Sequence, residues 1–251
     1  MPLVTRVEGD TPMTSPLGFV VTPERLITIR FQPNRLFEGF ADRLPRDKAL
    51  NLGPCHVFVG LLEAIVDRIA DVLEQIRSDL DTISLRIFKD DTVTGRRRRE
   101  DAQLRVTLKR IGRIGDLVSR IRDSLLGVGR IVPYAGHVAA GWIPADLRPR
   151  FKTLRQDIAS LNDYDAHLAN KIQFLLDAVL GFINIAQNNI IKVLTVVSVV
   201  GVPPTLVASI YGMNFKRMPE LDWTYGYPYV LTLIIISAIL PLIWFMRRGW
   251  L

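Results

Sequence analysis

Two long stretches without a charged residue constrain this 251-residue chain more than any other feature. They are residues 193–215 and residues 223–246. A helix needs roughly 20 apolar residues to cross the hydrocarbon core of a bilayer, and both stretches are long enough. Charged residues make up 23% of the chain, and all of them lie in the other segments. The sequence therefore predicts a mainly α membrane protein with two transmembrane helices.

Three amphipathic helices are expected ahead of and leading into the first span. Apolar residues recur at spacings of three and four in residues 57–88 and again in residues 104–125, which is the pattern of helices with one buried face. A polar break at residues 90–95 separates them, so residues 55–145 should form an antiparallel helical hairpin, and the chain should turn again within residues 132–145. A third helix should form a stalk over residues 146–189 and continue directly into a transmembrane helix at residues 190–211.

The first 54 residues predict a small α/β part. Residues 1–16 are rich in Thr and Pro and are expected to be a mobile arm. Two β-branched runs, residues 18–22 and 25–31, predict two strands, and residues 34–44 predict a short helix. At the other end of the chain we expect a loop at residues 212–226, a second transmembrane helix at 227–246 and a basic tail at 247–251.

Composition excludes several classes of protein. The single cysteine cannot form an internal disulfide, and the three histidines are far apart, so no zinc-like cluster is present. The net charge is +7, but the basic residues alternate with acidic ones along the expected helices. No aromatic platform accompanies them, which argues against nucleic-acid binding. The sequence shows no nucleophile–base pair and no phosphate-binding loop that would indicate an enzyme. The N-terminus has no apolar signal region, so we expect both termini to be cytoplasmic.

The hydroxyl side chains of the first span gather on one face. At about 100° per residue, Thr195, Ser198, Thr205 and Ser209 fall within an arc of about 80°, and Asn188 extends that arc. Polar groups inside a membrane usually face a bundle interior or a water path. Hydrogen bonds to a neighbouring helix, or back to the same helix, would explain the arc as well. The arc alone leaves these alternatives open.

A sequence motif follows the first span. Gly212, Met213 and Asn214 come directly after it, a Met-Pro-Glu-Leu loop occupies residues 218–221, and the chain ends in a basic-Trp-Leu segment. Together with residues 192–195, these motifs closely resemble the CorA family of divalent-cation channels. The close resemblance runs from about residue 175 to residue 251, with a looser likeness in helix order back to residue 57.

The resemblance implies a homopentameric channel in the cytoplasmic (inner) membrane that carries Mg²⁺ inward by passive, gated flow. Gly212, Met213 and Asn214 would form the outer ion-binding site, with Glu220 in the same loop. Mg²⁺ loses its water reluctantly, so a ring of neutral Asn214 carbonyls could hold the hydrated ion. A helix C-cap is the simpler explanation of a Gly and an Asn at this point. The pore-lining residues would be Asn188, Ile191, Leu194, Thr195, Ser198, Val202, Thr205 and Ser209, with Leu194 as the candidate hydrophobic gate.

Regulation and selectivity are further expectations from the resemblance. Asp177 matches an acidic residue that helps to bind a regulatory Mg²⁺ between neighbouring cytoplasmic domains. The family places a larger α/β sheet ahead of the helices, so we expect either that this sheet is truncated or that the chain begins late. Co²⁺ and Ni²⁺ are possible additional substrates, and a zinc-, cobalt- or nickel-transporting relative is the nearest alternative. A membrane-anchored helical scaffold without conduction is the alternative from another class.

Overall fold

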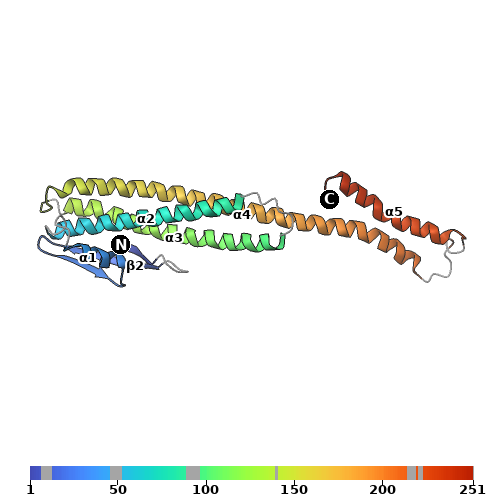
Figure 1. The fold of residues 1–251 in the computed structure, drawn as a ribbon, viewed down its shortest axis with the longest axis horizontal. Coiled ribbons are helices and arrows are strands. Elements are labelled where there is room, and N and C mark those ends of the chain that lie inside the picture. Colours follow the sequence, from blue (N-terminus) through green and yellow to red (C-terminus); the bar gives the residue numbers. More distant parts are fainter. Residues whose placement is uncertain are drawn as a thin grey trace. The chain divides into compact units, whose positions relative to one another are not determined.

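The computed structural model describes residues 1–6, 13–45, 53–88, 97–138, 141–213, 219 and 223–250. It divides into two compact units, Met1–Leu180 and Gly181–Leu251. The first unit contains a small antiparallel sheet and a bundle of long helices (Figure 1). The second contains the remainder of the longest helix and one further helix. The predicted fold class, a mainly α chain with two long apolar helices and a small N-terminal α/β part, is confirmed.

The sheet has three strands in the order β1-β2-β3, with β1 at Pro2–Arg6, β2 at Met13–Val21 and β3 at Leu26–Arg30. Strands β2 and β3 cover the two predicted β-branched runs. The expectation of a mobile arm over residues 1–16 is wrong for the described residues, because β1 and the start of β2 pair with each other. The amino group of Met1 donates to the Leu17 carbonyl at 2.7 Å, and the Leu17 amide donates back to the Met1 carbonyl.

Helix α1, Arg35–Arg43, confirms the predicted short helix. It begins where the Asn34 side chain accepts a hydrogen bond from the amide of Leu36 at 2.9 Å, as an N-cap residue does. Phe37 and Phe40 are the buried residues of this helix. The next helix, α2, begins at Pro54, where proline is well tolerated because the first amide of a helix has no intrahelical partner.

Three long helices form the core of the first unit: α2 (Pro54–Phe88), α3 (Arg97–Val138) and the first part of α4 (Leu147–Tyr211). They lie side by side, with the sheet and α1 near the start of α2 (Figure 1). Each contributes one stripe of buried apolar side chains, including Leu62, Leu73 and Leu80 from α2, Ile111, Ile121 and Leu125 from α3, and Leu154, Leu168 and Leu175 from α4. These stripes confirm the amphipathic pattern of the sequence.

The predicted hairpin is longer than its sequence pattern suggested. Helix α3 continues through Pro133 to Val138, whereas the chain was expected to turn from residue 132 onward. Val132 is 1% exposed and completes the buried stripe of α3, which explains why the helix persists past the proline. Small residues bring α3 close to α4: a Cβ built on Gly129 would lie 3.5 Å from the Ile158 side chain.

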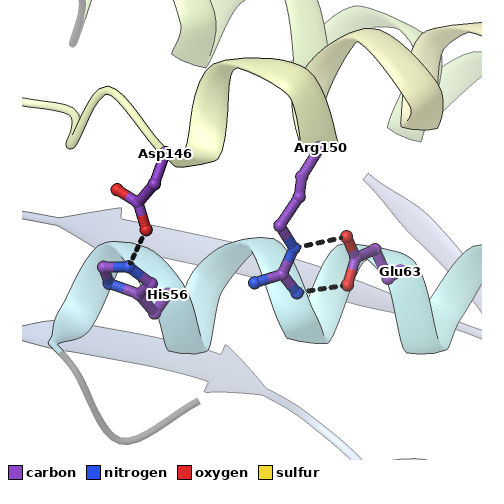
Figure 2. Close-up of polar contacts among 4 residues, drawn as sticks. All are labelled: His56, Glu63, Asp146 and Arg150. Atoms are coloured by element: carbon purple, nitrogen blue, oxygen red, sulfur yellow. Dashed lines mark hydrogen bonds and ion pairs between the residues drawn. The ribbon is translucent and has the colours of Figure 1, made fainter. Parts of the chain in front are cut away.

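Ion pairs connect the long helices at their edges. Arg110 of α3 pairs with Asp79 of α2 at 2.8 Å, and Lys171 of α4 pairs with Asp81 of α2. Near the start of α4, the Arg150 guanidinium donates to both carboxylate oxygens of Glu63 in α2 (Figure 2). Bidentate pairs of this kind fix the relative position of two helices more firmly than a single contact does.

A histidine and an aspartate make a second connection beside the Arg150–Glu63 pair (Figure 2). The Nε2 atom of His56, in the first turn of α2, lies 3.0 Å from the Asp146 carboxylate just ahead of α4. This hydrogen bond holds the pKa of Asp146 below its usual value. The first three turns of α2 and the start of α4 are thus joined at two points.

The second unit contains α4 from Gly181 onward and α5, Gly226–Arg247. Both α4 and α5 include a segment long and apolar enough to cross a membrane, and only 6% of each segment is buried within the protein. The core helix of a soluble protein would be mostly buried, so this low burial favours lipid or further protein chains as the surroundings. Helix α4 continues across Pro203 and Pro204 without interruption.

The packing of the first unit predicts the effect of a cavity. Leu73→Ala should lower its free energy of unfolding by about 2–5 kcal/mol, because Leu73 is fully buried and its neighbours cannot collapse completely into the space. Thermal unfolding of the purified protein in detergent measures the change. Leu85→Ala is the matched control in the same helix, since Leu85 is 72% exposed. Equal losses in the two variants would contradict the described core.

Candidate functional site

The polar arc of the first span lies on an exposed side of α4. Asn188, Ser198, Thr205 and Ser209 are exposed, and Thr195 is half-buried. The apolar residues interleaved with them are exposed too: Ile191 is 59%, Leu194 65% and Val202 61% exposed. Apart from the half-buried Thr195, the residues predicted to line a pore are therefore exposed within the second unit.

The covered side of the same helix is roughly opposite. Within residues 192–211 of α4, the buried or half-buried residues beyond the polar arc are Val196, Val200, Pro203, Pro204, Val207 and Tyr211. On a helical wheel these positions centre roughly 180° from the middle of the polar arc. These positions mark the more covered side of α4 within the second unit. The polar arc faces away from that side.

Two hydroxyls of the arc bond back to their own helix. Thr195 donates to the Ile191 carbonyl and Thr205 to the Gly201 carbonyl, each at 2.8 Å. One of the alternatives left open by the sequence is therefore realised for both threonines. Each oxygen still has lone pairs that can accept a hydrogen bond from water. The back-bonds lower the cost of a hydroxyl in an apolar segment without removing its capacity to hydrate a pathway.

The motif after the span begins in the last turn of α4. The Gly212 amide still donates to the Ala208 carbonyl at 2.9 Å, and Met213 is exposed. Gly212 does not adopt the left-handed conformation of a C-cap glycine. A Cβ at this position would lie 3.1 Å from the Ala208 carbonyl oxygen, so close backbone approach explains the glycine better. Asn214 and Glu220, the other predicted loop residues, lie outside the described residues.

Aromatic residues flank α5 at both ends, a feature that the sequence analysis did not use. Trp223 lies against Tyr225 and Tyr229 before and within the first turn, with ring centroids 6.3 and 5.9 Å away. At the other end Phe245 contacts Trp244 and Trp250. Such belts mark the two interfaces of a membrane. The clustering of Trp and Tyr at both ends of residues 223–250 could have revealed them from the sequence.

Asp177, the candidate regulatory residue, is exposed on α4 within the first unit. Its carboxylate accepts a hydrogen bond from the Gln173 side chain, one turn earlier, at 3.1 Å. Among the described residues no group of three His, Cys, Asp or Glu side chains could hold a metal ion. A metal bound at Asp177 would therefore need ligands from outside the described part of one chain.

A buried carboxylate lies between α3 and α4, away from the apolar helices. Asp165 is 1% exposed and pairs with Arg122 at 2.7 Å, while its second oxygen has no partner. Burial raises the pKa of Asp165, and the Arg122 pair opposes part of that rise. This carboxylate is held inside the bundle and is not accessible to a passing ion. We assign it to the packing of the first unit.

Comparison with known proteins gives a consistent result. The family described as CorA-like Mg²⁺ transporter protein matches residues 3–248. The magnesium transport protein CorA of Haemophilus ducreyi is 34% identical over 235 residues, which cover 94% of this chain and 71% of that protein. CorA of Escherichia coli K12 is 34% identical over 237 residues, which cover 94% and 72% of the two chains.

Solved structures share the fold. The CorA magnesium transporter from Methanocaldococcus jannaschii superimposes with a TM-score of 0.77 at 20% identity, over 100% of this chain and 76% of that one. The full-length CmaX protein gives a TM-score of 0.59 at 17% identity, over 99% and 77%. At these identities the likeness concerns the fold alone. The order of sheet, helical bundle and two apolar helices is therefore common to the three structures.

Proposed function

Because this chain belongs to the CorA-like Mg²⁺ transporter family, we propose that it carries Mg²⁺ across the cytoplasmic (inner) membrane by passive, gated influx. It is a transporter rather than an enzyme. The observation that carries the proposal is the polar face of α4, which lies opposite the side covered within its own chain and leads directly into Gly212, Met213 and Asn214. A single segment thus provides both the wall and the mouth of a pathway.

The pathway requires several copies of the chain. One polar face of one helix cannot enclose a pore, so copies of α4 must stand around a common axis with these faces inward. The family resemblance favours five copies. In that arrangement the more covered side of α4 points away from the axis, and α5 with its aromatic belts would face the lipid. Both termini would then lie in the cytoplasm.

Ion recognition belongs to the mouth of the pore. Mg²⁺ keeps most of its water, so it is best held through hydrogen bonds to its hydration shell. The side-chain carbonyl of Asn214 is a neutral acceptor suited to that task, and one from each copy would form a ring. Gly212 and Met213 set the backbone path that leads to it, and Glu220 in the same loop adds negative charge near the mouth. Oxygen ligands of this kind do not select soft metals.

Gating is assigned to the apolar positions of the same face. Ile191 and Leu194 are large and exposed, and Val202 continues the series. Rings of such side chains can close a narrow pore by excluding water. Thr195 and Ser198 interrupt the apolar series and would hydrate the path between Leu194 and Val202. We therefore propose Leu194 as the main hydrophobic constriction.

The loop provides the direct test of transport. Asn214→Ala should reduce Mg²⁺ uptake by roughly ten-fold or more, because a hydrogen bond to a charged, hydrated ion contributes about 1.5–3 kcal/mol. Uptake into cells that lack other magnesium transporters measures it, with membrane abundance matched. Asn189→Ala is the control, since Asn189 lies on α4 outside the polar arc. Wild-type uptake by Asn214→Ala would refute the ion-binding role. Added Co²⁺ or Ni²⁺ in the same assay tests whether these ions are further substrates.

Regulation gives a separate prediction. If Asp177 and carboxylates of a neighbouring copy bind cytoplasmic Mg²⁺, loss of the ion would let like charges repel one another and open the pore. Asp177→Asn should keep conduction but raise the internal Mg²⁺ concentration needed for half-inhibition several-fold. Mg²⁺ flux, measured at a series of internal Mg²⁺ concentrations, gives the shift in half-inhibition. Asp163→Asn, at another exposed aspartate of α4, should behave as wild type. Superimposable curves for Asp177→Asn and wild type would leave Asp177 as a solvated residue.

A further inference from the structure

An open groove in the first unit is lined by positively charged side chains that have no role in the proposed transport. It has a volume of about 730 Å³ and lies between the end of α3 and the start of α4. Arg148, Lys152 and Arg155 line it from α4, and all three are exposed. Within the described part of the chain, none of these three side chains has an ion pair or a hydrogen bond. The groove is therefore lined by cations that no described carboxylate pairs with.

The start of α4 separates its charges onto two sides. Arg148, Lys152 and Arg155 fall within an arc of about 60° at about 100° per residue. Arg150 and Asp157 lie on the opposite side, toward α2, where Arg150 is paired with Glu63 (Figure 2). Asp157 contributes there to the raised pKa of Asp67, after burial and the neighbouring Glu63 and Asp71. Within residues 147–159 the one acidic residue of α4, Asp157, thus lies on the α2 side, and the charged residues on the groove side are all cations.

The shape of the groove comes from small residues and an apolar wall. A Cβ built on Gly136 would meet nothing within 4 Å, and Ala159 lines the groove within the cationic arc. Val132, Pro133 and Phe151 line the groove beside the cations; Pro133 is exposed, and Val132 and Phe151 are buried beneath it. A ligand that fits must therefore combine several negative charges with an apolar body.

We propose that this groove binds a nucleoside polyphosphate. From Arg148 to Arg155 the cationic stripe extends about 10 Å at ~1.5 Å per residue, which suits a row of phosphates better than a single one. Arginine matches phosphate oxygens with paired N–H donors, and lysine adds a mobile point charge. The nucleoside ring would lie on the wall formed by Pro133 and Phe151. This binding is independent of the proposed transport, since all of its residues belong to the first unit.

Direct titration tests the proposal on the full-length protein. Calorimetry in nanodiscs of neutral lipid, in magnesium-free buffer, should show saturable binding of ATP, weaker binding of inorganic triphosphate, and none of adenosine. Triphosphate that binds as tightly as ATP would contradict the role of the apolar wall, and no saturable ATP binding would overturn the proposal. Displacement of ATP by short-chain phosphatidylglycerol would assign the groove to a lipid headgroup instead.

Two kinds of variant separate a built site from diffuse positive charge. Arg148→Gln, Lys152→Gln and Arg155→Gln combined should weaken ATP binding at least ten-fold. The control removes three exposed cations elsewhere, by Arg86→Gln, Arg105→Gln and Lys109→Gln, and should change binding less than two-fold. Ala159→Trp keeps every charge but fills the groove, and should also weaken binding at least ten-fold. Equal losses in the two charge variants, or unchanged binding in Ala159→Trp, would refute the site. Thermal unfolding confirms that each variant folds.

Discussion

A polar side chain within an apolar helix must find either a protein partner or water, and this requirement on α4 governs the interpretation of the whole molecule. Within its own chain α4 is covered on one side, and its hydroxyls and Asn188 lie on the other. Thr195 and Thr205 satisfy their donors on their own backbone, yet Ser198 and Ser209 remain exposed in the same arc. The face is complete only when further copies of the chain or a water path adjoin it.

The same helix serves a different purpose in the first unit. There α4 buries a regular apolar stripe against α2 and α3, and its polar residues are tied to their neighbours through Arg150–Glu63 and Lys171–Asp81. Those contacts give α4 a defined rotation about its axis in the bundle.

Local sequence patterns predicted much of this structure. The features they missed depend on contacts between segments far apart in the sequence. Amphipathic spacing was sufficient for α2 and α4, and uncharged length was sufficient for the two apolar helices. The strand at Pro2–Arg6 was missed because its stability comes from pairing with β2, which an isolated Thr- and Pro-rich segment does not reveal. Helix α3 passes Pro133 because Val132 is buried by neighbouring elements. The groove could not be predicted because it forms only where the end of α3 lies beside the start of α4. The polar arc was visible in the sequence, but its position opposite the covered side was not.

Thiol accessibility along α4 in the assembled protein tests the central claim most directly. The native Cys55 is buried and gives a low background. A charged, water-soluble methanethiosulfonate reagent should modify Ser198→Cys and Ser209→Cys rapidly and block Mg²⁺ flux, while Val196→Cys and Val207→Cys, on the covered side, stay unmodified. If the polar-arc cysteines are protected to the same degree as the covered ones, α4 does not line a water-filled pathway and the account is wrong.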